Sequence, residues 1–280
     1  MAGTLFVVAT PIGNLGDITY RAVQILNQVN LIACEDTRHT HKLLQHYGIN
    51  TKTISYHEHN EQQRTHELLE RILNGADVAL VSDAGTPTIS DPGFRIVQAA
   101  ALSGVTVIPI PGPSAVITAL TVAGLPTDEF LFVGFLPSKA TARRNKLKQL
   151  VSIEATLIFY EAPHRLAATL KDAASILGDR LAVVARELTK LHEQLRRGQL
   201  SELAQHYESE ETPRGEIVLL VDRNAIEPAT TTVQSTVADL VARLESEGMD
   251  HRLALKRAAR ELGLSRAEAY RQMLSERNKN

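Results

Sequence analysis

Residues 78–87, VALVSDAGTP, place a short apolar run directly before a loop of small, acidic and backbone-shaping residues. Four other apolar runs end in the same way: 5–9 before TPIGN (10–14), 31–34 before EDTR (35–38), 53–55 before YHEHN (56–60) and 105–110 before PGPSA (111–115). Between the runs lie segments of helical length, near 18–28, 37–47, 61–74, 93–103 and 114–124. This alternation predicts a parallel α/β sheet. Ligands bind at the carboxyl ends of such strands, so we expect the five loops to form one site.

The pattern changes after the break at residues 124–128, GLPTD. A second set of apolar runs follows, at 130–134, 156–160, 181–185 and 216–221, joined by helical segments at 141–151, 165–177 and near 200–208. Several joins are short, and short joins favour antiparallel strand pairs. We therefore expect two α/β domains, at residues 1–124 and 126–223.

The last part of the chain has a different composition. Residues 224–235, NAIEPATTTVQS, are typical of a linker, and residues 236–280 read as a helical unit. A helix at 251–262 and a second at 266–275 flank a turn that contains Gly263, with Ser265 as the expected N-cap. This pattern fits either a helix-turn-helix that binds nucleic acid or an ordinary pair of helices with a solvated basic face.

Composition limits the function only loosely. The chain has 280 residues, 44% of them hydrophobic and 22% charged, and a net charge of −2, which gives no overall attraction to nucleic acid or membranes. Residues 251–280 hold eight Lys or Arg against three Glu, a local charge of +5. Cys34 is the single cysteine, and its apolar run predicts a buried, unreactive thiol. We expect a soluble, cytoplasmic protein, because we see neither a basic-then-apolar leader nor an apolar run that approaches ~18 residues.

Common binding motifs are absent from the sequence. No G-x-G-x-x-G follows a strand, and there is neither a phosphate-binding G-x-x-x-x-G-K-[ST] nor a G-x-S-x-G elbow. His57, His59 and His66 lie close together without the H-E-x-x-H spacing, so we predict no metal site. The loops at 82–87 and 111–115 instead favour a partly apolar ligand held by backbone groups.

Six segments together resemble the class III, tetrapyrrole-methylase-like methyltransferases. They are VATPIGNL (8–15), EDTR (35–38), VSDAGTP (81–87), PGPSA (111–115), FYEAPHR (159–165) and RELTK (186–190). The closest similarity is to the bacterial branch that methylates a cytidine 2′-oxygen in 16S rRNA. The resemblance implies two α/β domains with S-adenosylmethionine in the cleft between them, a homodimer, and the decoding region of the 30S ribosomal subunit as the substrate.

The resemblance also implies which residues contact the cofactor. From the first domain they are Pro11, Ile12, Asp83, Gly85, Thr86, Ser114 and Ala115, and from the second Tyr160, Arg186 and Gly215. The first loop reads Thr-Pro-Ile-Gly, whereas the tetrapyrrole enzymes are richer in glycine there. This departure favours RNA over a porphyrinoid acceptor.

Methylation of a ribose hydroxyl needs a base, or a cation that stabilises the developing alkoxide. Candidates are Glu35, Asp36 and Lys190, with Glu187 beside the last of these. Asp36 fits an ordinary N-cap of the next helix equally well. Arg38 could hold a phosphate of the substrate.

Two basic regions are candidates for contacting RNA. Residues 138–149 contain basic side chains and no acid, among them Lys139, Arg143, Arg144 and Lys146. The C-terminal unit adds Arg266 and Arg271. Phosphate neutralisation by these residues would make binding depend on salt, whereas a solvated helix face is the structural alternative.

Two other functions compete with RNA methylation. A class III methyltransferase could act on a small molecule, such as a tetrapyrrole, or on a protein, but neither acceptor accounts for the basic segments. A helix-turn-helix regulator without catalytic activity leaves the five strand-end loops unexplained. Binding of S-adenosylmethionine separates the regulator from both enzymes.

Overall fold

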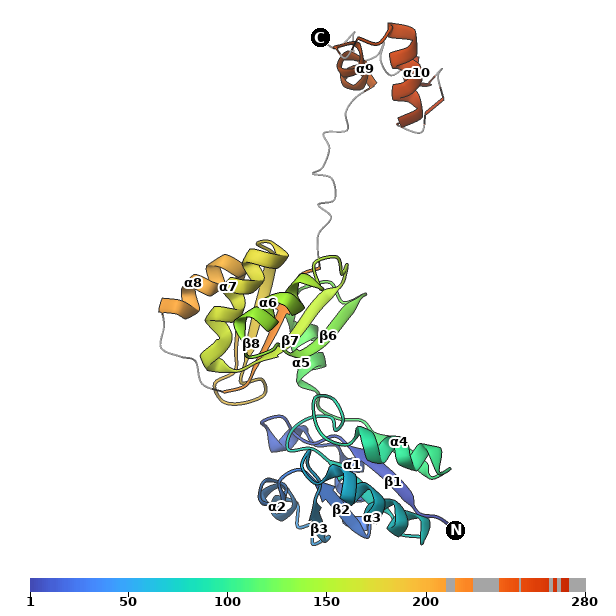
Figure 1. Ribbon diagram of the computed structural model, residues 1–280, viewed down its shortest axis with the longest axis vertical. Coiled ribbons are helices and arrows are strands. Elements are labelled where there is room, and N and C mark those ends of the chain that lie inside the picture. Colours follow the sequence, from blue (N-terminus) through green and yellow to red (C-terminus); the bar gives the residue numbers. More distant parts are fainter. Residues whose placement is uncertain (210–214, 224–236, 247, 262–263, 266–267, 272–280) are drawn as a thin grey trace. The chain divides into compact units, whose positions relative to one another are not determined.

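The computed structural model describes residues 1–209, 215–223, 237–246, 248–261, 264–265 and 268–271. The chain divides into two compact units, Met1–Asn224 and Ala225–Asn280. The first unit contains two five-stranded sheets, and the second is helical in its described part (Figure 1). The predicted linker at 224–235 lies outside the described residues. The α/β class predicted from the sequence is confirmed.

The first sheet is entirely parallel, as the strand–helix alternation predicts. Its strands are β1 (Thr4–Val8), β2 (Leu31–Cys34), β3 (Thr53–Ser55), β4 (Val78–Val81) and β5 (Thr106–Ile110), in the order β3-β2-β4-β1-β5. The strands β4, β1 and β5 are neighbours. The loops that follow these three strands therefore start side by side.

Helices cover both faces of this sheet. They are the 3-10 helix η1 (Leu15–Asp17), α1 (Tyr20–Gln28), α2 (Thr37–His46), α3 (Glu61–Leu73) and α4 (Phe94–Leu102). Side chains alternate along a strand, so Val78 and Leu80 of β4 pack with α3 and α4, whereas Ala79 and Val81 pack with α1 and α2. This burial on both faces explains why the central strands read as continuous apolar runs.

The second sheet is mixed. Its strands are β6 (Phe130–Phe135), β7 (Thr156–Glu161), β8 (Leu181–Arg186), β9 (Gln194–Gln199) and β10 (Ile217–Val221), in the order β6-β7-β10-β8-β9. The β6–β7 pair is parallel and the other pairs are antiparallel. One face carries α6 (Ala140–Lys148), α7 (Leu166–Leu177) and α8 (Leu200–Ser209), with the 3-10 helix η2 (Pro163–Arg165) before α7.

The helix α5 (Ala115–Ala123) covers the other face of the second sheet. Its Leu120 packs with Ile158 of β7 and Leu220 of β10. The sequence assigned this segment to the first domain because it follows β5 along the chain. Its apolar side chains are instead buried against the second sheet.

The strand β9 is missing from the sequence prediction. Its residues, QLRRGQ, show no apolar alternation, because β9 pairs only with β8 at the sheet edge. Arg197 donates from Nε to the carbonyl oxygen of Ala123 at 3.0 Å, at the last residue of α5. An unpaired helix-end carbonyl therefore receives a charged donor from this strand.

The second unit has its own small core. The helices α9 (Val237–Ser246) and α10 (His251–Glu261) bury Leu240, Leu244 and Ala258, together with Ala269. The predicted N-cap is confirmed, because the Ser265 hydroxyl accepts from the Glu268 backbone N–H at 3.3 Å. Residues 272–275 of the predicted second helix lie outside the described part of the chain.

Among the described residues, no helix is both long enough and apolar enough to cross a bilayer.

Candidate functional site

A cavity of about 400 Å³ in the first unit is lined by loops from both sheets. We call it the central cavity. The structure brings together eight of the ten residues that the resemblance implies for the cofactor: Ile12, Asp83, Gly85, Thr86, Ser114, Ala115, Tyr160 and Gly215. Pro11 and Arg186 do not line it. Three of the five predicted loops, at 10–14, 82–87 and 111–115, thus converge on one cavity, whereas those at 35–38 and 56–60 do not line it.

Backbone hydrogen bonds fix the loops of the first sheet to one another. Thr10 and Gly85 exchange two of them, with N–O distances of 2.8 and 3.0 Å. The Thr86 hydroxyl donates to the Pro113 carbonyl oxygen at 3.2 Å. Gly85 has a φ of +79°, a conformation that favours glycine. These hydrogen bonds hold the loops that form the floor of the central cavity.

The second sheet contributes a charged cluster at the rim. Lys190 Nζ donates to Glu187 Oε1 at 2.8 Å and to Glu216 Oε2 at 3.1 Å. Burial lowers the pKa of Lys190, but these hydrogen bonds outweigh it and raise the pKa above its ordinary value. A Cβ on Gly13 would lie 2.4 Å from Lys190 Cγ. Lys190 is therefore a paired cation that packs against the first loop.

An aromatic wall closes another side of the central cavity. Tyr160 contacts Phe135 and Phe132, with ring centroids 5.5 and 4.9 Å apart. Burial raises the pKa of Tyr160 to about 12, with Asp91 and Glu216 adding to the shift. Its hydroxyl therefore stays protonated at neutral pH and can donate a hydrogen bond.

Acidic side chains gather at the same place. Asp83, Asp91 and Glu216 line the central cavity, whose described lining contains no Lys, Arg or His. Burial raises the pKa of Asp91 to about 6, and the nearby carboxylate of Glu35 contributes. The pKa of Glu35 is raised as well, by burial and then by Asp83. This concentration of negative charge favours a ligand that carries positive charge.

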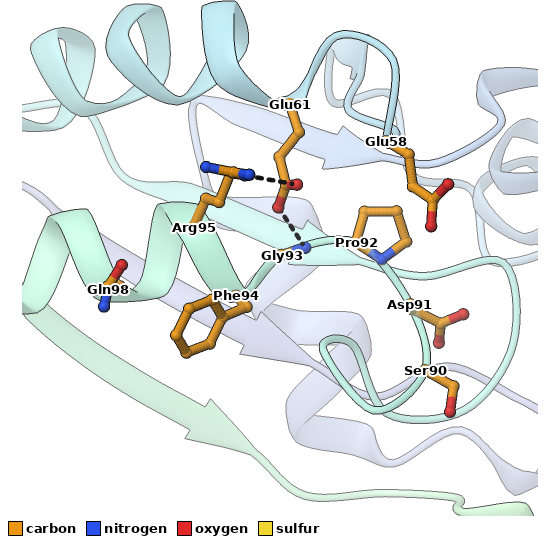
Figure 2. A pocket seen from close by; sticks show the side chains of 9 residues that line it. All are labelled: Glu58, Glu61, Ser90, Asp91, Pro92, Gly93, Phe94, Arg95 and Gln98. Atoms are coloured by element: carbon orange, nitrogen blue, oxygen red, sulfur yellow. Dashed lines mark hydrogen bonds and ion pairs between the residues drawn. The ribbon is translucent and has the colours of Figure 1, made fainter. Parts of the chain in front are cut away.

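A second cavity, of about 450 Å³, shares lining residues with the first. We call it the α4 cavity, and it is lined by Glu58, Glu61, Ser90, Asp91, Pro92, Gly93, Phe94, Arg95 and Gln98. Ser90 and Asp91 line both cavities. Figure 2 shows the Glu61 carboxylate between Arg95 and the Gly93 backbone, at 3.3 Å from Arg95 Nε and 3.2 Å from Gly93 N.

Asp36 is the N-cap of α2, which is one of the two roles that the sequence left open for it. Its carboxylate accepts from the Arg38 backbone N–H at 2.8 Å as the N-cap of α2, and it also pairs with the Arg38 guanidinium. These hydrogen bonds lower the pKa of Asp36 to about 2. Such a carboxylate is a weak base, so Asp36 is a poor candidate for proton abstraction. The exposed guanidinium of Arg38 is bound to this cap.

The structure corrects one of the RNA-binding predictions. Arg143 is buried, and its Nη2 lies 2.6 Å from Asp172 Oδ2, with both side chains 7% exposed. Arg143 is therefore not accessible to a phosphate. The sequence segment lacks an acid, but the partner comes from α7. Arg144 shares Asp172 with a largely exposed side chain, and Lys139 is exposed.

The remaining predicted residues fall in different settings. Lys146 is half-buried on α6. Arg271 is exposed in the second unit, whereas Arg266 lies outside the described residues. Cys34 is fully buried, which confirms its predicted burial, and burial raises its pKa to about 11.

Comparison with known proteins identifies the lineage. Residues 4–204 match the family of tetrapyrrole (corrin/porphyrin) methylases. The chain belongs to this family.

Several members of the methylase family that are similar to this chain share one name. Proteins called ribosomal RNA small subunit methyltransferase I are 49% identical in Synechocystis sp. (96% of each chain), 48% identical in Xylella fastidiosa (96% of this chain, 98% of the relative) and 53% identical in Pseudomonas aeruginosa (79% of each chain).

Solved structures of distant relatives have the methylase fold. Diphthine synthase aligns with a TM-score of 0.61 at 16% identity, over 79% of this chain and 90% of that one. A uroporphyrin-III C-methyl transferase from Thermus thermophilus, complexed with S-adenyl homocysteine, aligns with a TM-score of 0.54 at 17% identity, over 78% of this chain and 97% of that one.

Sequence reasoning missed several residues that line the central cavity, among them Phe135, Glu216 and Asp91. Asp91 lies in the loop of residues 88–93, which follows β4 after the better-recognised 82–87 segment. Two non-glycine residues of this loop, Thr88 and Ser90, have positive φ values of 74° and 65°. The signal available in the sequence was an aspartate among small residues at the same strand end.

Proposed function

We propose that this chain is an S-adenosylmethionine-dependent methyltransferase that modifies the ribosomal RNA of the small subunit. One observation carries the proposal: proteins 48–53% identical to it share the name of that activity, and two of those alignments cover 96% of this chain. The central cavity supplies a site in which the reaction could occur.

The lining of the central cavity fits the methyl donor. Its volume of about 400 Å³ lies in the range of small-molecule sites. Ile12, Ala115 and Val218 offer apolar contact to a nucleoside, and Asp83 and Glu216 offer negative charge to a sulfonium and an ammonium group. Gly85 and Gly215 contribute backbone groups to the lining.

S-adenosylmethionine supplies a methyl group already activated by a positively charged sulfur. The chain must hold the acceptor oxygen in line with that group and exclude water, which is mostly a matter of proximity and orientation. The two hydrogen-bonded loops at Thr10 and Gly85 make this framework rigid. The Tyr160 hydroxyl, which stays protonated, is available as a donor to the ligand.

We further propose that the acceptor is a cytidine 2′-oxygen of 16S rRNA in the 30S subunit, and that the enzyme works in the cytoplasm as a homodimer. The strand-end loops resemble those of the methyltransferases that act on a cytidine 2′-oxygen, and this resemblance supports the choice of acceptor. Exposed apolar side chains on β6 and α5, such as Phe130, Leu131, Ile117 and Val122, support self-association.

We propose that RNA contacts the exposed side chains of the basic segment at residues 138–149. Lys139 and Arg144 are exposed near α6, and Lys146 is half-buried. Arg38 and Arg271 are further proposed contacts. Cations of this kind neutralise phosphates and position the substrate without reading its sequence.

The test is transfer of labelled methyl to small ribosomal subunits from a strain that lacks this protein, followed by nucleoside digestion. Naked 16S rRNA and RNA-free samples are the controls. Labelled 2′-O-methylcytidine supports the whole proposal. Label in another nucleoside retains the enzyme class but rejects the acceptor, and no label in RNA points to a small-molecule or protein acceptor.

A further inference from the structure

The two cavities of the first unit meet at Ser90 and Asp91. The central cavity has the lining expected for a methyl donor. The α4 cavity is built by elements of the first sheet's domain alone, from the start of α3 to the first turns of α4 (Figure 2). A group that reacts with the methyl donor has to reach the junction between them.

Asp91 is fixed at this junction by its loop. Gly93, two residues later, has a φ of 134°, and a Cβ on it would lie 2.7 Å from Leu80 Cδ2 of β4. Its N–H donates to the Glu61 carboxylate of α3. Left-handed conformations at Thr88 and Ser90 cost energy and tend to persist at functional sites. The loop is therefore held between strand and helix in one conformation.

The charged groups near Asp91 come from its own β4–α4 loop and from two other parts of the chain. They are Glu35 after β2, Asp83 after β4 and Glu216 before β10, together with a hydrogen bond from Ser82. The negative charge of Asp91 also contributes to the raised pKa of Tyr160 on β7. Asp36 pairs with the guanidinium of Arg38. Asp91 has no such ion pair in the described part of the chain. Burial and these carboxylates raise the pKa of Asp91 to about 6, so at neutral pH it is ionised and is a stronger base than an ordinary aspartate.

The α4 cavity offers the contacts that an unstacked nucleotide needs. Phe94 is 64% exposed and presents a ring on which a base can stack. Gln98 and Glu58 supply an amide and a carboxylate, and a carboxylate can accept from the exocyclic amine of cytosine. Arg95 adds a guanidinium beside Phe94 that is largely exposed.

We propose that the α4 cavity receives the nucleotide to be methylated and that Asp91 accepts the proton of its ribose hydroxyl. This inference rests on the proposed function. The ribose oxygen bonds to the methyl carbon while the carbon–sulfur bond breaks, with its electron pair remaining on sulfur. The hydroxyl proton passes to a carboxylate oxygen of Asp91 and from there to water.

The catalytic part is tested by single-turnover methylation of unmethylated small subunits across pH. The wild-type rate should rise with pH through an apparent pKa near 6, because Asp91 acts when deprotonated. Asp91→Asn should lower the plateau rate at least ~100-fold and abolish this rise. Glu35→Gln removes a neighbouring negative charge, so the rise should move to lower pH.

Matched controls separate chemistry from folding. Asp128→Asn changes an exposed aspartate that pairs with Arg223, and it should retain the wild-type rate and pH profile. Calorimetric affinity for S-adenosylhomocysteine, which has no sulfonium charge, should stay within about threefold of wild type in Asp91→Asn. An Asp91→Asn enzyme with the wild-type rate and pH profile overturns the role of Asp91.

The binding part is tested by cross-linking, which does not depend on turnover. Phe94→p-azidophenylalanine, irradiated with unmethylated small subunits and S-adenosylhomocysteine, should cross-link next to the nucleotide that wild type methylates. Phe130→p-azidophenylalanine, on β6 and outside both cavities, should not. Absence of that cross-link from position 94, or its appearance from position 130 alone, overturns the assignment of the α4 cavity.

Failure of the proposed function gives a different result. Wild-type protein that transfers no methyl to any RNA removes the proposed function and this inference with it. Active wild type with an unaffected Asp91→Asn variant and no cross-link from position 94 removes the inference alone.

Discussion

Arg143 and Asp172 form a buried ion pair that joins α6 to α7, with Nη2 and Oδ2 2.6 Å apart. Nε of Arg143 also donates to the same carboxylate oxygen at 2.7 Å. Arg144, the next residue, binds the other oxygen from the exposed side. Two adjacent arginines in one basic segment therefore have different roles, and only Arg144 presents its charge to solvent.

Asp172→Ala should destabilise the protein by about 3–5 kcal/mol, because it leaves the Arg143 charge buried without a partner. Urea denaturation measures the change. Glu208→Ala removes a partner of Lys171 in an exposed pair and should cost no more than about 1 kcal/mol. Equal losses in the free energy of unfolding from the two variants would contradict the role of Asp172 as the buried partner of Arg143.

Lys139→Ala should weaken binding to small ribosomal subunits and reduce the slope of log affinity against log salt by about 0.7, because one phosphate contact is lost. Lys52→Ala is the matched control, since Lys52 is exposed just before β3, at the opposite edge of its sheet from the strand-end loops. If Lys139→Ala leaves the salt slope unchanged, Lys139 does not contact an RNA phosphate.

Gly215→Ala should weaken S-adenosylmethionine binding at least tenfold. A Cβ there would lie 2.0 Å from Glu187 Oε1, and displacement of Glu187 disturbs its contact with Lys190 at the cavity rim. Gly178→Ala has a similar φ, +89° against +90°, with no atom within 4 Å of the added carbon. Both positions have a φ that L side chains rarely adopt, so both variants should lose stability, by about 1–3 kcal/mol, but Gly178→Ala should bind the ligand normally in calorimetry.

Asp36→Asn should retain activity, because asparagine also caps helices and the lowered pKa of Asp36 makes it a poor base. Asp36→Ala should lower the melting temperature at pH 7. The folded-state pKa of about 2 lies below the ordinary 3.8, so this stabilisation is present above pH 4 and is lost as pH falls towards 2. Inactive but normally folded Asp36→Asn protein would restore Asp36 as a catalytic candidate.

Asp91→Asn should be more stable than wild type at pH 8. The pKa of Asp91 rises from 3.8 to about 6 on folding. The stability that its protonated carboxyl group contributes is therefore fully present below pH 4 and is lost as pH rises through 6. After allowance for partial exposure to solvent, the gain is about 1–2 kcal/mol. Thermal unfolding at pH 8 and at pH 3.5 should show the difference only at the higher pH.

The parallel first sheet was predictable because four of its five strands are local apolar runs and each strand ends in a distinctive loop. Burial on both faces produces such runs in β2 and β4, which lie inside the sheet. The position of Cys34 at the end of β2 predicted its burial for the same reason. The polar edge strand β9 carries no such pattern and was missed.

The sequence by itself determined the strands of the first sheet and the loops at their ends, because these depend on periodicity and turn chemistry over a few residues. Only the tertiary structure decided that α5 packs on the second sheet, that Asp172 neutralises Arg143, and that Asp91 stands where two cavities meet. Each of these depends on groups far apart in the chain, whose distance and shared exclusion of water arise only on folding.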